Sequence, residues 1–170
     1  MLKKIGLGVL ALLILFLLSL VWRAYASHSM DPDLGYANTS EASGIITESS
    51  DMNRQLKPCP QSPNCVATQT DQADKKMSPL SFSGDPTQAQ EKLKTMILGL
   101  GRTALISEEP GYLHFTFKTW PIPFIDDVEF LFVNEQQLIH FRSASRVGYS
   151  DLGANRKRMK KVSDRWQARG

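Results

Sequence analysis

A dense run of polar and charged side chains fills residues 142–158, RSASRVGYSDLGANRKR. Guanidinium groups form paired hydrogen bonds with carboxylate or phosphate, and the start of a helix offers unpaired N–H groups to the same anions. This composition predicts a site that binds an anionic group or a protein partner. Its candidate residues are Arg142, Ser143, Ser145, Arg146, Asp151, Asn155, Arg156 and Arg158.

The same residues also admit a purely structural interpretation. Ser150 or Asp151 would cap the helix that follows, because a short polar side chain accepts from the free N–H groups of a first turn. The arginines would pair with acidic residues earlier in the chain, namely Asp126, Asp127 and Glu129. The segment would then stabilise the fold instead of holding a ligand.

A hydrolase is a third interpretation, with Ser143 or Ser145 as nucleophile and His140 as base. The sequence lacks the G-x-S-x-G elbow that positions such a serine. His114, His140 and Glu129 could also converge on a metal ion. We favour a binding domain without catalysis, metal or cofactor, and keep the hydrolase and a structural scaffold of an envelope complex as alternatives.

Cys59 and Cys65 enclose five residues in a proline-rich loop, CPQSPNC. The spacing is too wide for a C-x-x-C redox motif. In an oxidising compartment the pair predicts a structural disulfide, worth roughly 2 kcal/mol for so short a loop.

Hydrophobic periodicity predicts one α+β domain over residues 58–168. Asp85 and Pro86 suit the cap and the first position of a helix, and apolar residues follow at helical spacing. A second helix should begin at Ser150 or Asp151. Alternating patterns predict strands at 103–107, 112–119, 127–133 and 137–142, with a short edge strand within 77–83. We expect an antiparallel sheet of about four strands, covered on one face by two helices.

The register of the last two strands follows from the side-chain period of two. Pairing Val133 with Leu138 keeps apolar residues opposite one another and places Glu129 opposite Arg142. If exposed, that cross-strand pair would contribute at most ~1 kcal/mol.

Residues 5–22, IGLGVLALLILFLLSLVW, form an uncharged apolar run. A helix of this length spans roughly 27 Å, close to the ~30 Å hydrocarbon core of a bilayer. Lys3 and Lys4 place the N-terminus in the cytoplasm by the positive-inside rule. The sequence therefore predicts a cytoplasmic tail (1–4), a transmembrane anchor in the lipid bilayer (5–22), a flexible linker (23–57) and an extracytoplasmic domain (58–168). A cleaved signal peptide ending at Ala26 is the alternative, and it leads to the same compartment.

This topology and the cysteine usage predict a single-pass protein of the bacterial inner membrane with its domain in the periplasm. The net charge is only +3, but residues 151–170 hold seven Lys and Arg against two Asp. Such asymmetry indicates an anionic partner. Outside the cytoplasm this would be lipid headgroups, a cell-wall polymer or an acidic protein, and not nucleic acid.

Three motifs resemble an uncharacterised family, the domain-of-unknown-function family fourteen-ninety-nine. They are C-P-x-S-P-N-C at 59–65, D-V-E-F at 127–130 and R-S-x-S-R-x-G-x-x-D-x-G-x-N-R-x-R at 142–158. The resemblance covers roughly residues 58–166. It implies a domain boundary and marks residues to test, but it implies no activity, cofactor or ligand.

Overall fold

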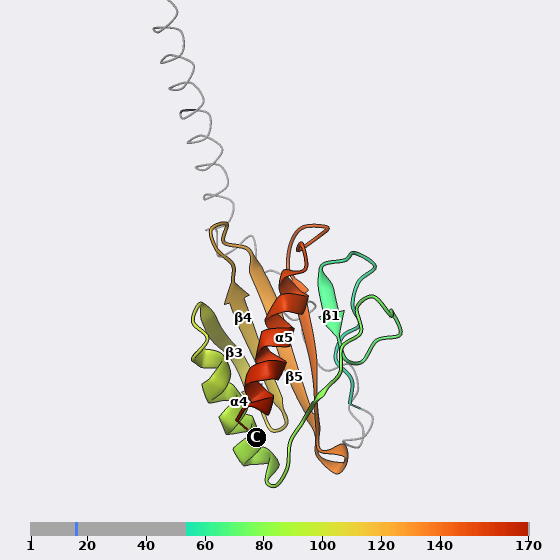
Figure 1. Ribbon diagram of the computed structural model, residues 1–170, viewed down its shortest axis with the longest axis vertical. Helices are drawn as coiled ribbons and strands as arrows, with labels where there is room; N and C mark the ends of the chain where they lie inside the picture. Colours follow the sequence, from blue (N-terminus) through green and yellow to red (C-terminus); the bar gives the residue numbers. More distant parts are fainter. Residues whose placement is uncertain (1–15, 17–53, 170) are drawn as a thin grey trace, which may run out of the picture. The chain divides into compact units, whose positions relative to one another are not determined.

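The computed structural model describes residue 16 and residues 54–169, and these later residues form an α+β domain (Figure 1). Six antiparallel strands make one sheet in the order β1-β6-β5-β4-β3, and β2 also pairs with β6. The strands are β1 (Cys65–Ala67), β2 (Leu80–Ser81), β3 (Thr103–Glu109), β4 (Tyr112–Lys118), β5 (Ile125–Val133) and β6 (Leu138–Ser145). A short 3₁₀ turn, η2 (Asn134–Gln136), joins β5 to β6.

Two helices, α4 (Pro86–Leu98) and α5 (Ala154–Gln167), cover the same face of the sheet (Figure 1). Alternate strand residues such as Phe115, Phe130 and Phe141 point to this face, because successive side chains of a strand alternate between faces. They form the main core with Leu93 of α4 and Met159 of α5. The predicted α+β arrangement with two helices on one face is therefore confirmed.

The start of α4 follows the predicted capping chemistry. Asp85 Oδ1 accepts a 2.8 Å hydrogen bond from the backbone N of Gln88, and Pro86 occupies the first turn. A proline there loses no intrahelical hydrogen bond, because the first N–H groups of a helix have no partner within it. The helix ends at Leu98, and Gly99 follows as its C-terminal cap.

The predicted register of β5 and β6 is confirmed. Val133 pairs with Leu138, Phe130 with Phe141 and Glu129 with Arg142. A slip by one residue would have moved every apolar side chain of one strand to the opposite face.

The expectation of about four strands was wrong. No strand was predicted at β1, which extends the sheet by pairing Cys65 with Ala144. Three residues are too few for a periodic signal, so only tertiary pairing reveals this strand. The second helix also begins later than expected, at Ala154, because Asp151 accepts hydrogen bonds from Gly153 and Asn155 and holds a turn before the helix.

The face of the sheet opposite the helices carries charge and is nevertheless buried. Glu129 has no exposed surface, so the limit of ~1 kcal/mol, which holds for an exposed pair, does not apply to its pair with Arg142. Leu56, within the predicted linker, packs on this face against Tyr112 and Leu131. The disulfide loop packs there too, with Cys59 and Cys65 against Ala67 and Ala144.

The predicted tail, anchor and most of the predicted linker lie outside the described residues, apart from Phe16. Among the residues that the structure describes, no helix combines the length and apolar character needed to cross a bilayer. The membrane anchor stays a prediction from sequence.

Candidate functional site

Four polar residues of the 142–158 segment, Ser143, Ser145, Asn155 and Arg158, meet at the end of the sheet where β6 leads into α5. Asn155, fully buried, is the centre of this cluster on the helix-covered face. Its Oδ1 accepts hydrogen bonds from Ser143 Oγ at 2.6 Å and from Arg158 Nη1 at 2.6 Å. Its Nδ2 donates to Ser145 Oγ at 3.1 Å and to the carbonyl oxygen of Asn64 at 3.0 Å. Every hydrogen-bonding position of this side chain is thus used within the protein.

Asn64, in the proline-rich loop, fixes the segment that follows β6. Its Nδ2 donates to the carbonyl oxygen of Gly148 at 2.6 Å, and its own carbonyl accepts from the backbone N of Ser145 at 3.0 Å. Ser62 Oγ donates to Asn64 Oδ1 at 2.8 Å. The two motifs at 59–65 and 142–158 are therefore two sides of one hydrogen-bonded structure.

Arg158 joins this cluster to β5. Its Nη2 donates to a carboxylate oxygen of Asp126, which is buried, and its guanidinium lies over the ring of Phe117 at 4.9 Å. The ion pair neutralises a carboxylate that would be costly to bury alone. Arg158 therefore serves the fold, as the structural interpretation of the sequence expected.

The side chain of Arg142 lies on the opposite face of the sheet and pairs with a different carboxylate, that of Glu129. Its Nη1 donates to Glu129 Oε2 at 3.0 Å, and Tyr112 donates its hydroxyl proton to Glu129 Oε1 at 2.8 Å. All three side chains are buried. A buried ion pair is sensitive to the loss of either partner, because the remaining charge is left without compensation.

Arg146 forms a two-pronged ion pair with Asp127 on this second face. Its Nε and Nη2 each donate to a carboxylate oxygen at 2.9 Å, and His114 Nε2 lies 2.8 Å from Asp127 Oδ1. Burial by itself would raise the pKa of Asp127, but the hydrogen bonds and charges of His114 and Arg146 together hold that pKa below its ordinary value. The carboxylate is therefore ionised at neutral pH.

The serine–histidine pair of the hydrolase alternative does not form. Ser143 points to the helix-covered face, whereas His140, three residues earlier in β6, points to the other. His140 Nδ1 lies 3.0 Å from Thr68 Oγ1, and burial lowers the pKa of its imidazole. The two groups lie on opposite sides of a sheet and cannot exchange a proton directly.

The metal alternative does not form either. His114 contacts Asp127, His140 contacts Thr68, and Glu129 contacts Arg142. Within residues 54–169, no three potential ligands from His, Cys, Asp and Glu lie together.

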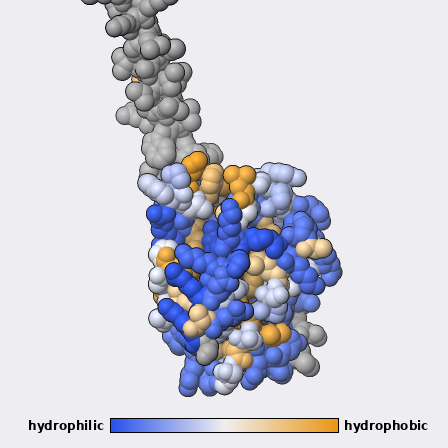
Figure 2. Space-filling model, in the orientation of Figure 1, coloured by the Kyte–Doolittle hydropathy of each residue, from blue (hydrophilic) through white to orange (hydrophobic). Residues whose placement is uncertain are grey.

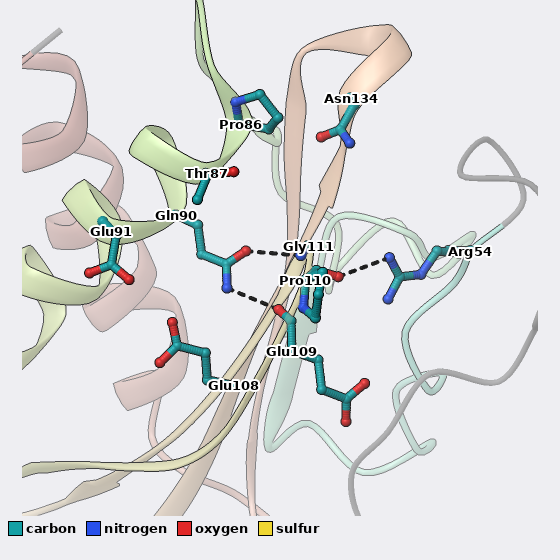
Figure 3. Close-up of a pocket in the computed structure, with 10 residues that line it drawn as sticks. All are labelled: Arg54, Pro86, Thr87, Gln90, Glu91, Glu108, Glu109, Pro110, Gly111 and Asn134. Carbon is teal, nitrogen blue, oxygen red and sulfur yellow. Dashed lines mark hydrogen bonds between the residues drawn. The ribbon is translucent and has the colours of Figure 1, made fainter.

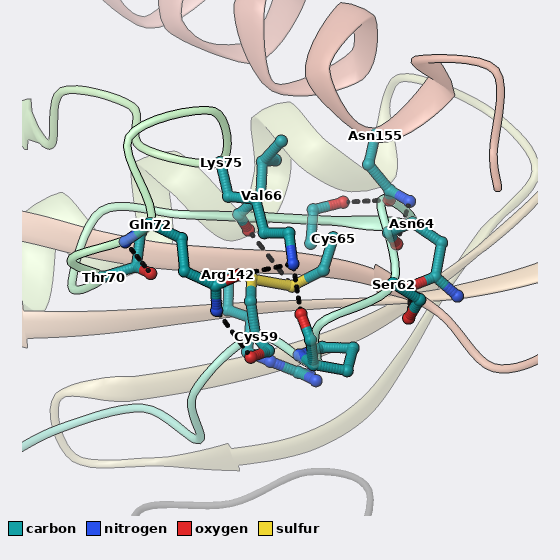
Figure 4. The surroundings of a disulfide bond; sticks show 12 residues. Cys59, Ser62, Asn64, Cys65, Val66, Thr70, Gln72, Lys75, Arg142 and Asn155 are labelled. Atoms are coloured by element: carbon teal, nitrogen blue, oxygen red, sulfur yellow. Dashed lines mark hydrogen bonds between the residues drawn. A yellow bond between two sulfur atoms is a disulfide. The ribbon is translucent and has the colours of Figure 1, made fainter. Parts of the chain in front are cut away.

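The predicted disulfide is present, with Cys59 and Cys65 bridged at a Cα–Cα distance of 5.7 Å (Figure 4). Lys75, although buried, donates to the carbonyl oxygen of Pro60 and to Gln72 Oε1 at 2.6 Å. Gln72 Nε2 donates to the carbonyl oxygen of Cys59 at 3.1 Å. The loop is thus held by a covalent bridge and by hydrogen bonds from Lys75 and Gln72 to two of its carbonyl groups.

The remaining two candidates of the predicted site act on the backbone. Asp151 Oδ1 accepts from the N of Gly153 at 2.9 Å, and its Oδ2 accepts from the N of Asn155 at 2.7 Å. Arg156 reaches the carbonyl oxygens of Lys76 and Asp74. All eight candidates therefore lie near the junction of β6 and α5, but their polar groups are engaged with the protein itself.

A larger pocket, of about 580 Å³, lies at the other end of β4, between the start of α4 and the β3–β4 turn (Figure 3). Gln90 lines it and bridges the backbone of that turn, accepting from the N of Gly111 and donating to the carbonyl oxygen of Glu109, both at 2.9 Å. The pocket contains none of the predicted site residues. Two of its three acidic side chains, Glu91 and Glu108, form ion pairs with Lys94.

Among residues 54–169, basic side chains without a carboxylate partner are concentrated on α5 and just beyond it. Six side chains on the exposed surface of this segment are cations: Arg156, Lys157, Lys160, Lys161, Arg165 and Arg169. Within residues 54–169, only Lys160 of these six forms an ion pair with a carboxylate, that of Asp164. Figure 2 shows the hydrophilic surface that runs along this side of the domain.

Sequence reasoning identified the arginines and their acidic partners but missed two features. Asn64 and Lys75 carry much of the hydrogen bonding, yet an asparagine and a lysine in a polar loop give no signal of burial. The second feature is a group of exposed apolar side chains on the loops around Trp120 and Leu152. The run WPIPF, with its large apolar residues in a proline-rich turn, was the available signal.

Comparison with known proteins confirms the family to which the sequence was found similar. A family model described as "Protein of unknown function (DUF1499)" matches residues 55–165. No curated protein and no solved structure matches the chain.

Proposed function

Because the chain belongs to the DUF1499 family of proteins of unknown function, we propose a role from its own surface: it is a non-catalytic binding domain of the bacterial cell envelope. In this proposal residues 5–22 anchor it in the inner membrane, and the domain lies in the periplasm. Its partner is a polyanion, either a cell-wall polymer or an acidic protein, which binds the exposed basic surface of α5.

The observation that carries this proposal is that one set of cations is paired with buried carboxylates, whereas another set is exposed on α5. Arg142, Arg146 and Arg158 are committed to buried carboxylates. The exposed cations of α5 have one carboxylate among them within the described residues. The surface of α5 therefore offers charge to a partner, whereas the predicted site of residues 142–158 mainly holds the fold.

The arrangement of these cations is costly for an isolated helix. Lys157, Lys161 and Arg165 follow one another at four-residue spacing, and like charges at this spacing destabilise a helix by a few tenths of a kcal/mol each. Lys157 also lies in the first turn, where the helix dipole disfavours a cation. Arg165 lies in the last turn, where the dipole favours one. An anionic partner would relieve the repulsion between Lys157 and Lys161.

The test is site-specific photo-crosslinking in living cells from position 161 of the full chain, with mass spectrometry of the product. The matched control is position 88, where Gln88 is exposed on α4. We expect capture of a defined anionic polymer or acidic protein from position 161 alone, and its loss when Lys157→Glu and Arg165→Glu are added. Equal capture from both positions, or capture that survives charge reversal, would contradict the proposal.

A further inference from the structure

Two loops at one end of the sheet expose large apolar side chains. Trp120 and Ile122 lie in the loop between β4 and β5, and Val147, Tyr149 and Leu152 lie between β6 and α5. The exposed fractions of Trp120, Tyr149 and Leu152 are 73%, 77% and 88%. Figure 2 shows hydrophobic surface gathered at the end of the domain where Figure 1 draws these loops. We call these five residues the apolar tip.

The two loops are neighbours. The backbone N of Arg146 donates to the carbonyl oxygen of Ile125 at 3.1 Å, which ties the end of β6 to the beginning of β5. A small cavity of about 70 Å³ is lined by Thr119 and Phe124 from one loop and by Val147 and Gly148 from the other. The apolar tip is therefore one patch built from two segments.

Both loops are braced from within. Thr119 N donates to the carbonyl oxygen of Phe124 at 2.9 Å, and Phe124 N donates back to Thr119 Oγ1 at 2.8 Å. The other loop is held by Asn64, through its bond to Gly148, and by Asp151. The hydrogen-bonded cluster around Asn155 thus supports the segment that carries three of the five residues of the tip.

The backbone conformation of Leu152 is independent evidence that the fold itself exposes the apolar tip. Its φ is +52°, a left-handed conformation that side chains other than glycine and asparagine rarely adopt. This backbone directs a leucine into solvent at the outer end of the loop. Strained conformations of this kind cluster at binding sites, where the surrounding structure holds them.

The composition of the tip matches a membrane–water interface. Tryptophan and tyrosine concentrate at the headgroup level of bilayers, where an apolar ring and a polar edge are both accommodated. Cations flank the patch: the guanidinium of Arg102 lies over the Trp120 ring at 5.4 Å, and Lys118 is exposed at the end of β4. Basic side chains around an apolar patch are complementary to anionic phospholipids.

We propose that the apolar tip inserts into the headgroup region of the same bilayer that anchors residues 5–22. The predicted tether keeps the domain close to that surface, which raises the effective concentration of the tip at the bilayer. In a domain docked through the tip, the exposed surface of α5 lies along the side of the domain and not against the bilayer. The membrane contact is therefore separate from the polyanion site and does not depend on it.

A release experiment tests the insertion on the full chain. The protein is reconstituted into vesicles of phosphatidylethanolamine and phosphatidylglycerol, with a protease site introduced into the segment 23–53. After cleavage we expect the wild-type domain to stay on the vesicles. The variant Trp120→Ser/Leu152→Ser should be released, with a vesicle-bound fraction lower by about tenfold or more, because two apolar side chains no longer leave water.

The matched control is Leu98→Ser/Ile106→Ser, which removes two exposed apolar residues outside the tip. It should stay bound like the wild type, and so should the α5 variant Lys157→Glu/Arg165→Glu. Complete release of the wild type, or equal release of tip and control variants, would overturn the proposal.

Depth-dependent quenching tests the same insertion in the uncleaved protein. In a Trp22→Phe background, Trp120 should be quenched by phospholipids that carry bromine on their acyl chains, whereas Trp166 lies on the buried face of α5 and should not be. Adding Trp120→Phe should abolish the quenching. If Trp120 were not quenched while a photo-crosslinker at position 120 captured a defined protein in cells, the tip would be a protein-docking surface instead.

Discussion

Removal of one partner from the Glu129–Arg142 pair should destabilise the domain strongly, and removal of both should cost no more than removal of one. The two side chains lie 3.0 Å apart, with 0% and 7% of their side-chain surface exposed. Loss of either partner from a buried pair typically costs 3–5 kcal/mol, about the stability of a marginal domain, because it leaves a buried charge unpaired. We therefore expect about 3–4 kcal/mol for Glu129→Leu and for Arg142→Met.

The double variant Glu129→Leu/Arg142→Met should lose about the same amount as either single variant. Neither charge remains, and the residual cost is that Tyr112 loses the carboxylate that accepts its hydroxyl proton at 2.8 Å. The coupling energy of the cycle is then about 3 kcal/mol. The matched control is the exposed pair Lys160–Asp164, for which the same cycle should give roughly 0.3–0.5 kcal/mol.

Urea unfolding of the full chain in non-ionic detergent, followed by tryptophan fluorescence, measures these free energies. Trp166 is buried and donates to the carbonyl oxygen of Ser81 at 2.7 Å, so it reports on the packing of α5. A coupling energy for the buried pair as small as that of the exposed pair would refute the reasoning. If Arg142→Met had the same free energy of unfolding as the wild type but no longer captured a partner, Arg142 would be a ligand-binding residue instead.

Three further predictions concern the disulfide, one histidine and the centre of the polar cluster. The double variant Cys59→Ser/Cys65→Ser should lower the free energy of unfolding by roughly 2 kcal/mol, and reductant should lower the melting temperature of the wild type only; unchanged melting would contradict this. Burial lowers the pKa of the His140 imidazole in the folded state. The unfolded chain, in which this pKa has its ordinary value of about 6.5, therefore binds more protons near that pH. The free energy of unfolding should fall as the pH drops through that value. His140→Gln should flatten this dependence in thermal melts, and an unaltered slope would exclude His140 as its source. Asn155→Ala should cost about 2–4 kcal/mol in urea unfolding, because Ser143, Ser145 and the Asn64 carbonyl each lose a hydrogen bond, whereas Gln167→Ala on the exposed end of α5 should cost less than about 0.5 kcal/mol; similar values for the two would show that the cluster contributes little.

The sheet register could be predicted because one face of each strand is apolar. In β5 and β6 the alternation of Val128, Phe130 and Phe132 against Ile139 and Phe141 admits one pairing without burying the wrong face. The start of α4 was equally accessible, since Asp85 and Pro86 act locally. Helix capping by neighbouring residues and an apolar pattern on one face of a strand can both be read directly from the sequence.

Burial of the face of the sheet opposite the helices could not be read from the sequence in this way. His114, Asp127 and Glu129 alternate with apolar residues in the manner of a solvent-exposed face, yet all three are buried. They are buried because the charges neutralise one another across neighbouring strands, and because the disulfide loop covers part of this face. Only tertiary pairing can reveal that arrangement, and β1 was missed for the same reason.

The predicted binding residues illustrate the ambiguity of arginine in a sequence. A guanidinium that pairs with a buried carboxylate and one that awaits a ligand look alike until the partner is located. The acidic residues Asp126, Asp127 and Glu129 were the distinguishing feature, because three carboxylates within four residues of a buried strand require three cations nearby. Arg142, Arg146 and Arg158 meet that requirement.

This pairing changes how the segment 142–158 should be tested. Its polar groups lie behind the apolar tip and brace the loop that carries Val147, Tyr149 and Leu152. A substitution at Asn155 or Asn64 would thus weaken membrane contact only through the stability of that loop, whereas Leu152→Ser would weaken it without unfolding. Measuring stability and membrane retention in parallel separates the two effects: tip variants should change retention alone, and variants of the polar cluster should change both together.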